Sequence, residues 1–273
     1  EYIGDEFGKT VIGFFADEPH VPKNPWTDDF LKVFKEKKGY GLRPYLPALF
    51  FEKVPLDVRR VRYDYYDVWS DLFRNRFSGH IAKWCHKNNL LFTMHICGEE
   101  SPKILIKDMN GDYFKVMQPV DIPGIDVIWR QIWWDKEEDF PKLASSSAHF
   151  SGKTRAMSET NAVYGRGLSV EQAKWVADYQ LVRGINLFFV MEFLSSLETF
   201  RRYWHPVDLS PDNVLWPYIK DYNQYVSRVS YLLSQGYPGC KIAVYYPTTS
   251  IWAEDDEKIE QIINKTKLLS KRL

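Results

Sequence analysis

The chain has 273 residues, with 36 lysines and arginines against 36 aspartates and glutamates, so its formal net charge is zero. This balance argues against a nucleic-acid binder, which needs a basic excess to hold phosphates, and against a polybasic protein of the membrane surface. Hydrophobic residues make up 45% and charged residues 26%, which is typical of a globular domain rather than a disordered chain. The most apolar stretch, Ile185 to Leu194, is interrupted by Glu192 and is too short to cross a bilayer.

The three cysteines indicate neither a disulfide framework nor a zinc site. Cys85, Cys97 and Cys240 cannot all pair with one another, and none lies in a CxxC motif. Unpaired cysteines favour a cytoplasmic location, whereas a secretion signal upstream of Glu1 would direct the protein out of the cytoplasm. The cellular location therefore stays open.

Short apolar runs that end at polar residues recur along the chain and predict buried strands. These runs are Val11–Ala16, Leu90–Ile96, Ile125–Trp129, Arg155–Ser158, Ile185–Phe193 and Lys241–Tyr246. Helical periodicity fills the intervals, over residues 27–39, 57–88, 140–150, 169–183 and 213–235, and a charged helix closes the chain. Strands that alternate with helices predict an α/β fold with a parallel sheet. Neither a GxGxxG motif after a strand nor a GxxxxGK[ST] motif supports nucleotide binding.

Acidic residues follow the predicted strands at one recurring position. They are Asp17, Glu18, Glu99, Glu100 and Glu159, and Glu192 lies inside an apolar run. In a barrel of parallel strands the active-site groups lie where the strands end. An alternative reading is that each acid only favours the N-terminus of the next helix.

Two carboxylates across a cleft are the apparatus of glycoside hydrolysis, in which one protonates the leaving oxygen and the other attacks or activates water. We expect Glu18 to be the general acid and Glu159 to be the nucleophile or base. Aromatic rings and polar side chains near the same strand ends are suited to a carbohydrate substrate. The candidate substrate-binding residues are Asp17, His20, Trp26, His95, Glu99, Trp129, Trp133, Asn161 and Glu192.

The segment Phe15–Pro19 resembles the end of strand four in the (β/α)8 barrels of clan A glycoside hydrolases, where the acid/base glutamate lies. Ser158-Glu159 resembles the end of strand seven, which carries the second catalytic glutamate. The two predicted strands between them agree with this count. The resemblance implies that only strands four to eight of a TIM-type barrel are present, over residues 1–238, and that the rest of the barrel lies upstream of Glu1. A half-barrel has open strand edges, so we expect this chain to be a segment of a longer polypeptide.

A narrower resemblance is to the α-L-rhamnosidases of glycoside hydrolase family 106. It rests on Trp26-Thr27, on the stretch GYGLRPYLP at residues 39–47, and on Met157-Ser158-Glu159. The closing KIAVYYP resembles the start of an α/β domain that follows the barrel, here residues 239–273. The resemblance implies a rhamnosidase-like hydrolase to which calcium can bind, whereas the residues themselves indicate no cofactor.

Two other functions stay open at this point. One is a non-catalytic barrel that binds carbohydrate through its aromatic residues. The other is a metal-dependent barrel hydrolase that uses His95, Glu99 and a further acid. All three hypotheses expect a sugar or small-molecule partner rather than nucleic acid or a membrane.

Overall fold

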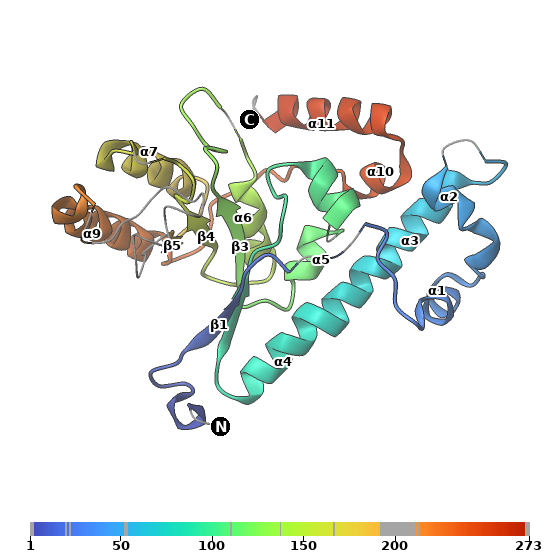
Figure 1. Cartoon of the computed structure of the whole chain (residues 1–273), viewed down its shortest axis with the longest axis horizontal. Coiled ribbons are helices and arrows are strands. Elements are labelled where there is room, and N and C mark those ends of the chain that lie inside the picture. The colour runs from blue at the N-terminus through green and yellow to red at the C-terminus, as the bar shows by residue number, and fades with distance from the viewer. Residues whose placement is uncertain are drawn as a thin grey trace. The chain divides into compact units, whose positions relative to one another are not determined.

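The computed structural model describes residues 3–19, 21, 23–51, 54–109, 111–136, 138–165, 167–191, 211 and 213–270 (Figure 1). The chain divides into two compact units. The sheet unit comprises Glu1–Asp17, Leu90–His95 and Asp121–Gly239, and the helical unit comprises Glu18–Asn89, Ile96–Val120 and Cys240–Leu273. No helix among these described residues has the length and apolar character needed to cross a membrane.

The sheet unit is built on five parallel strands that pair in chain order. They are β1 (Gly13–Ala16), β2 (Leu91–Met94), β3 (Ile122–Val127), β4 (Met157–Thr160) and β5 (Leu187–Val190). The ring of Phe15 in β1 stacks on that of Phe189 in β5, with 5.3 Å between the centroids. Since β1 and β5 are the first and last strands of the sheet, this contact requires the sheet to curl. The architecture is a five-stranded half-barrel, which confirms the expectation of a partial barrel.

Three helices of the sheet unit are α6 (Pro141–Phe150), α7 (Val170–Leu181) and α9 (Trp216–Leu233). Helices α7 and α9 lie side by side in Figure 1, and Ala177 and Tyr222 form a buried cluster between them. Phe188 and Val190 of β5 pack against this cluster. The even-numbered residues of β5 therefore face the helices, and the odd-numbered ones face the concave side of the sheet.

Local sequence signals account for the start of α7. The Ser169 side chain accepts a hydrogen bond from the Gln172 N–H, and the Gln172 side chain accepts one from the Ser169 N–H. This capping box satisfies two donors that the first turn of a helix leaves open. The prediction of a helix beginning at Ser169 is confirmed.

The helical unit contains the remaining elements. They are α1 (Phe30–Lys38), η2 (Arg43–Tyr45), α2 (Pro47–Phe50), α3 (Val58–Phe73), η3 (Arg74–Ser78), α4 (Gly79–Lys87), η4 (Ile104–Met109), α5 (Tyr113–Met117), α10 (Thr248–Ala253) and α11 (Asp256–Ser270), while η1 (Gly4–Glu6) belongs to the sheet unit. Helix α1 ends at Gly39, whose φ of 78° is strained for any residue with a side chain. The single helical pattern over residues 57–88 becomes α3 and α4 joined by η3, a π-helical turn.

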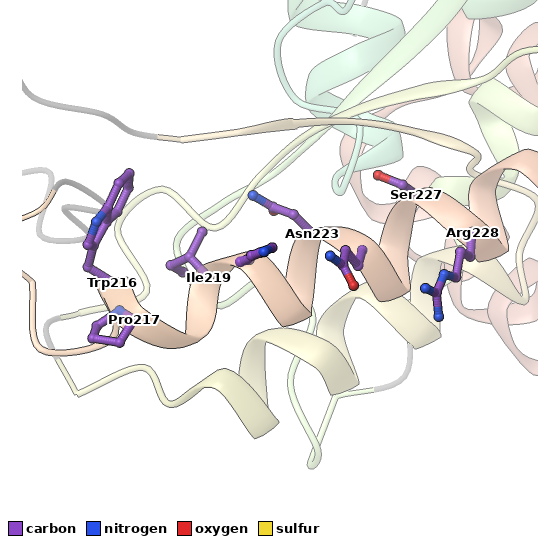
Figure 2. Close-up of a pocket in the computed structure, with 8 residues that line it drawn as sticks. Trp216, Pro217, Ile219, Asn223, Ser227 and Arg228 are labelled. Atoms are coloured by element: carbon purple, nitrogen blue, oxygen red, sulfur yellow. The ribbon is translucent and has the colours of Figure 1, made fainter.

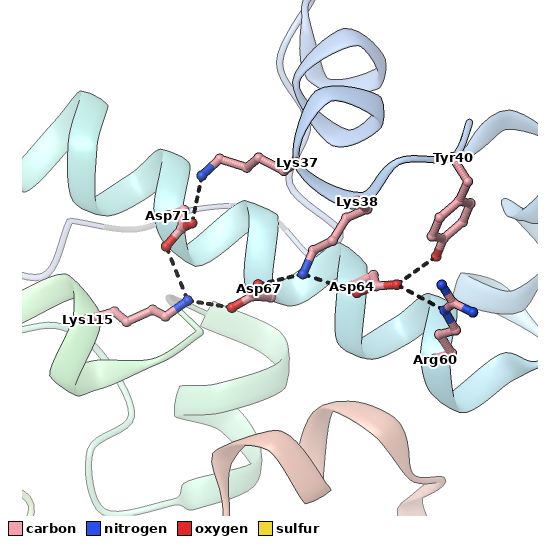
Figure 3. Close-up of polar contacts among 8 residues, drawn as sticks. All are labelled: Lys37, Lys38, Tyr40, Arg60, Asp64, Asp67, Asp71 and Lys115. Atoms are coloured by element: carbon pink, nitrogen blue, oxygen red, sulfur yellow. Dashed lines mark hydrogen bonds and ion pairs between the residues drawn. The ribbon is translucent and has the colours of Figure 1, made fainter.

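An ion-pair network holds α1 and α5 against one face of α3 (Figure 3). Its acids are spaced at helical intervals on α3: Asp64, Asp67 and Asp71. The lysines come from α1 (Lys37 and Lys38) and from α5 (Lys115), and Tyr40 and Arg60 contact Asp64. Because most of these side chains are half-buried, the network fixes the packing of the three helices.

The segment 241–247 is neither helix nor strand. The sequence predicts a strand over Lys241–Tyr246, but the apolar side chains of Ile242 and Tyr245 are exposed. The following α10 packs firmly, because Trp252 is buried and its indole N–H donates to the Ile106 carbonyl at 3.2 Å. A β-rich segment needs a neighbouring strand for its hydrogen bonds, and the described residues supply none here.

Candidate active site

The concave face of the half-barrel carries an acidic cluster at the ends of its strands. Glu159 of β4 is in register with Phe189 of β5, so both side chains lie on the concave face. Its neighbour Thr160 faces the other way, since the Thr160 hydroxyl accepts a hydrogen bond from Gln180 of α7 at 3.0 Å. Glu159 is 7% exposed. A carboxylate buried to this degree on an apolar sheet requires polar partners.

His95 supplies such a partner and links Glu159 to Asp17. The His95 Nε2 atom lies 3.1 Å from Glu159 Oε2 and also 3.1 Å from Asp17 Oδ1. His95 directly follows β2 and is fully buried, whereas the Asp17 side chain, directly after β1, is 68% exposed. Because Ala16 pairs with Met94, the residues that follow them, Asp17 and His95, lie side by side at the strand ends. The imidazole therefore orients one buried and one exposed carboxylate.

Asp126 is a further acid of the concave face and is not among the residues predicted from the sequence. It is in register with Glu159 on the neighbouring β3 and is 5% exposed. Burial raises the pKa of Tyr164 and the Asp126 carboxylate raises it further, so the hydroxyl stays protonated and donates to the Ile132 carbonyl at 2.9 Å. The sequence feature that could have identified Asp126 is an acid inside the apolar run IDVIW, the same feature that singled out Glu192.

The tryptophans after β3 differ in their surroundings. Trp133 packs on Tyr164 with 5.8 Å between centroids, and the Arg130 guanidinium lies 5.2 Å above its ring. Trp129 is 43% exposed and has a φ of 53°. Strained backbone of this kind persists only where the surrounding structure enforces it. Of the predicted binding residues on this loop, Trp129 is open to a ligand and Trp133 is part of the packing.

Asn161 follows β4 with a φ of 76° and its side-chain oxygen is buried. It lines a small hollow together with Tyr222 and Leu168, between α7 and α9. The structure thus places Asn161 among the helices that cover the sheet.

Glu18, Trp26 and Glu99 belong to the helical unit. Glu18 has a φ of 37°, directly after Asp17. Glu99 is 2% exposed, and its Oε1 atom accepts a hydrogen bond from the Ile96 N–H at 2.9 Å. This contact closes the turn after β2. Trp26 is 46% exposed and contacts the ring of Phe30, with 4.8 Å between centroids. His20 and Glu192, also predicted to bind substrate, lie outside the described residues.

The geometry can accommodate a cation. Asp17, His95 and Glu159 each offer one ligand atom, and these atoms lie within 4.8 Å of one another. Two carboxylate oxygens and one imidazole nitrogen suit a transition metal better than calcium, which takes about six to eight oxygen ligands. The cluster fits calcium only if further oxygens complete the shell.

A hollow that none of these acids lines runs along α9 (Figure 2). Its lining consists of Trp216, Pro217, Ile219, Lys220, Asn223, Gln224, Ser227 and Arg228. Among the described residues, one helix supplies every side chain that lines this hollow and none of them is a carboxylate, so these side chains do not offer the carboxylate pair of glycoside hydrolysis.

Comparisons with known proteins agree with this geometry. A curated protein of Formosa agariphila, provisionally named a beta-glucuronidase, is 25% identical over 243 residues, which cover 86% of this chain and 20% of that protein. The solved structure of a rhamnosidase from Novosphingobium sp. PP1Y matches with a TM-score of 0.66 at 23% identity, covering 86% of this chain and 23% of the other, and so shares the fold. The chain spans less than a quarter of the length of these relatives. A family model described as alpha-L-rhamnosidase matches residues 1–264, and the chain therefore belongs to glycoside hydrolase family 106.

Proposed function

We propose that this chain carries the active site of a glycoside hydrolase and that Glu159 is one of its two catalytic carboxylates. The observation that carries this proposal is the contact between Glu159 and His95 on the concave face, at 3.1 Å. An imidazole at this distance can hold the carboxylate in one orientation in a buried setting. Glu159 then acts as the nucleophile or as the base that activates water.

For the second carboxylate we propose Glu18, acting as the general acid. Its support is the sequence pattern at the end of β1, where it follows Asp17. Asp17 shares His95 with Glu159 and so adjoins the reaction centre in this proposal. The separation of the two catalytic carboxyl groups decides the configuration of the product at the anomeric carbon. A separation of about 5–5.5 Å gives retention and one of about 6.5–9.5 Å gives inversion.

We further propose an α-L-rhamnoside as the substrate, because the matching family model bears that description. In this proposal β1 to β5 correspond to strands four to eight of a (β/α)8 barrel, residues 1–238 are its C-terminal portion, and residues 239–273 begin a following α/β domain. The remaining strands come from chain outside these 273 residues.

The test uses the protein with Glu159→Gln and Glu18→Gln, assayed on a panel of aryl glycosides that includes α-L-rhamnoside. Each change removes a charge and keeps the shape, so kcat is expected to fall by about 10²- to 10⁴-fold, the usual contribution of a positioned acid or base. Glu171→Gln is the matched control, since Glu171 is an exposed acid in the first turn of α7. Near-normal turnover by either catalytic variant, with the control also active, rejects that residue's role.

The ligand spacing of Asp17, His95 and Glu159 favours a second candidate, a cation-dependent hydrolase. In this case the cation supplies charge stabilisation at the reacting oxygen, and the three side chains hold it. Dialysis against a chelator is then expected to abolish turnover, and addition of calcium or of zinc separately identifies the metal. Unchanged turnover after dialysis rejects this candidate and leaves the two-carboxylate proposal intact.

A further inference from the structure

The loop that follows β3 presents an aromatic ring and a guanidinium group from two consecutive residues. We call residues 128–134 the β3 loop. Trp129 is 43% exposed, and Arg130 is exposed as well. Both have a φ of 53°, in the left-handed region that residues with side chains rarely adopt. Backbone strain of this kind is typical of ligand-binding segments, where the surrounding structure enforces it.

Hydrogen bonds to the segment after β4 hold the β3 loop in this conformation. The Trp129 N–H donates to the Ala162 carbonyl at 3.2 Å, and the Arg130 Nε–H donates to the Tyr164 carbonyl at 2.9 Å. Ala162 follows Glu159 by three residues. Since β3 and β4 are paired, the β3 loop and the Glu159 carboxylate lie at the same end of the sheet.

The Arg130 guanidinium is oriented but retains unused donors. Its hydrogen bond to Tyr164 and its position 5.2 Å above the Trp133 ring fix its plane. Within the part of the chain that the structure describes, no carboxylate forms an ion pair with Arg130, and its Nη nitrogens donate no hydrogen bond. A planar guanidinium with free Nη donors binds a carboxylate or a sulfate ester in a bidentate manner.

The open edges of the half-barrel do not account for this exposure. β3 is the central strand of the sheet, and β2 and β4 pair with its two sides. Strands that complete a barrel add to the free edges of β1 and β5. The β3 loop is therefore flanked on both sides by segments that follow paired strands.

The charges at the strand ends distinguish two parts of a ligand. Asp126 and Glu159 are buried carboxylates of the concave face, whereas Arg130 is exposed in the loop beyond β3. The sugar that is cleaved must reach the buried Glu159, so the leaving sugar lies farther out, toward the exposed loop. A negative charge on the cleaved sugar would be repelled by the carboxylates, whereas one on the leaving sugar would be attracted by the guanidinium.

We propose that Trp129 and Arg130 bind the leaving sugar, with its ring stacked on the indole and an anionic group, a carboxylate or a sulfate ester, on the guanidinium. The apolar face of a sugar ring suits an exposed indole, and the free Nη donors suit either anion. The substrate class is therefore an acidic oligosaccharide in which a neutral sugar is cleaved from a uronic acid or from a sulfated sugar. This inference rests on the proposed function, because it takes Glu159 to mark the reaction centre.

The experiment compares three disaccharides in which α-L-rhamnose is linked to glucose, to glucuronic acid or to glucose 6-sulfate. They differ only at C6 of the leaving sugar. The parent protein is expected to hydrolyse one or both charged disaccharides with a kcat/KM about 10- to 100-fold above that of the neutral one, the usual effect of a charge-assisted hydrogen bond. Arg130→Gln is expected to lose this preference. Arg130→Lys keeps the charge without the planar fork and is expected to retain part of it.

Lys142→Gln is the matched control, since it removes one positive charge from an exposed residue of α6 in the same unit. It is expected to keep the preference of the parent protein. Equal kcat/KM values for the three disaccharides in the parent protein overturn the inference, and so does a preference that survives in Arg130→Gln. A preference restricted to the carboxylate or to the sulfate ester supports the inference and identifies the anion.

The Trp129 ring has its own test, which also serves if the arginine variants fail to fold. Trp129→Leu is expected to lower kcat/KM for all three disaccharides about tenfold and to leave methyl α-L-rhamnoside, which has no leaving sugar, unchanged. The control is Trp134→Leu, because Trp134 is 75% exposed in the same loop. Equal effects of the two changes, or an equal loss with the methyl glycoside, overturn the inference.

Calorimetric binding keeps the inference separate from the proposed function. If the parent protein hydrolyses none of the disaccharides, it is titrated with each of them, in parallel with Arg130→Gln. Binding of a charged disaccharide that weakens about tenfold in Arg130→Gln then supports the inference and rejects the hydrolase. Turnover that does not depend on Arg130 rejects the inference and leaves the hydrolase intact, and absence of both binding and turnover overturns both.

Discussion

Asn186 is expected to be among the costliest side chains to remove from the sheet unit. It is 4% exposed, just before β5, and its amide makes three hydrogen bonds. Its oxygen accepts from the Ala156 N–H at 3.0 Å, and its nitrogen donates to the carbonyls of Thr154 at 2.9 Å and Leu233 at 3.2 Å. These contacts tie β5 to the start of β4 and to the end of α9. In Asn186→Ala one buried N–H and two carbonyls lose their partner.

The buried Ala156 N–H left without a partner costs about 1–3 kcal/mol, and each lost hydrogen bond to the exposed residues Thr154 and Leu233 costs about 0.5–1 kcal/mol, so the free energy of unfolding is expected to fall by about 2–5 kcal/mol. For a chain of this size that corresponds to a drop in Tm of roughly 10 °C. The assay is urea unfolding followed by circular dichroism. The control is Asn88→Ala, whose amide donates to a single carbonyl at 2.8 Å, with an expected loss below about 1 kcal/mol.

The Asn186→Asp variant adds a pH test. Its new oxygen faces two carbonyls, which together with burial raise the pKa of the carboxyl above its unfolded value of about 4. The native state then binds more protons than the unfolded one, so its stability deficit is expected to shrink as pH falls from 7 toward 4. A loss under about 1 kcal/mol in Asn186→Ala, or a deficit in Asn186→Asp that does not depend on pH, would refute this reasoning.

Three further predictions concern the rest of the described structure. Lys115→Met is expected to cost about 1–2 kcal/mol by urea unfolding, more than Lys37→Met, because Lys115 pairs with both Asp67 and Asp71 and Lys37 with Asp71 alone. Burial acts to raise the pKa of Asp67 and of Asp71, but the lysines outweigh it and hold both below their usual range. Their contribution to stability is therefore present above about pH 4 and is expected to disappear as pH falls below it, in unfolding curves at pH 3–7. Gly124→Ala is expected to lower the free energy of unfolding by about 1–3 kcal/mol, because the added carbon would lie 2.7 Å from a backbone oxygen of β2. A thermal unfolding curve with the Tm of the parent protein would contradict this.

Local signals were enough to predict the order of the strands and the start of α7. The five barrel-type apolar runs all contain or overlap a strand, because short apolar runs of this kind are typical of parallel strands. The capping box at Ser169 depends on residues three apart, so it could be read directly from the chain. The segment 241–246 has the same local character, and a strand there depends on a neighbouring strand rather than on its own residues.

The candidate site depends on register, which the sequence does not display. His95 and Glu159 are 64 positions apart, and their contact follows from the pairing of β2, β3 and β4. The same pairing brings Asp126 beside Glu159. Glu159 could be predicted because it ends an apolar run, whereas Asp126 lies inside one and was not predicted. The difference between Trp129 and Trp133 likewise arises from long-range packing on Tyr164.

The π-helical turn η3 has a consequence for how α3 and α4 tolerate changes in length. A π-turn holds one more residue per turn than an α-helix, and Gly79, directly after it, has room for no side chain because a carbon there would lie 2.7 Å from the Arg74 carbonyl. Deleting one residue between 74 and 78 would let the turn relax into ordinary α-helix. Because the π-turn fits its surplus residue into one turn, α4 would keep its rotation about the axis, and its buried side, with Ala82 and Cys85, would stay in place. The turn thus absorbs one surplus amino acid locally, and α3 and α4 keep the phase of one continuous helix.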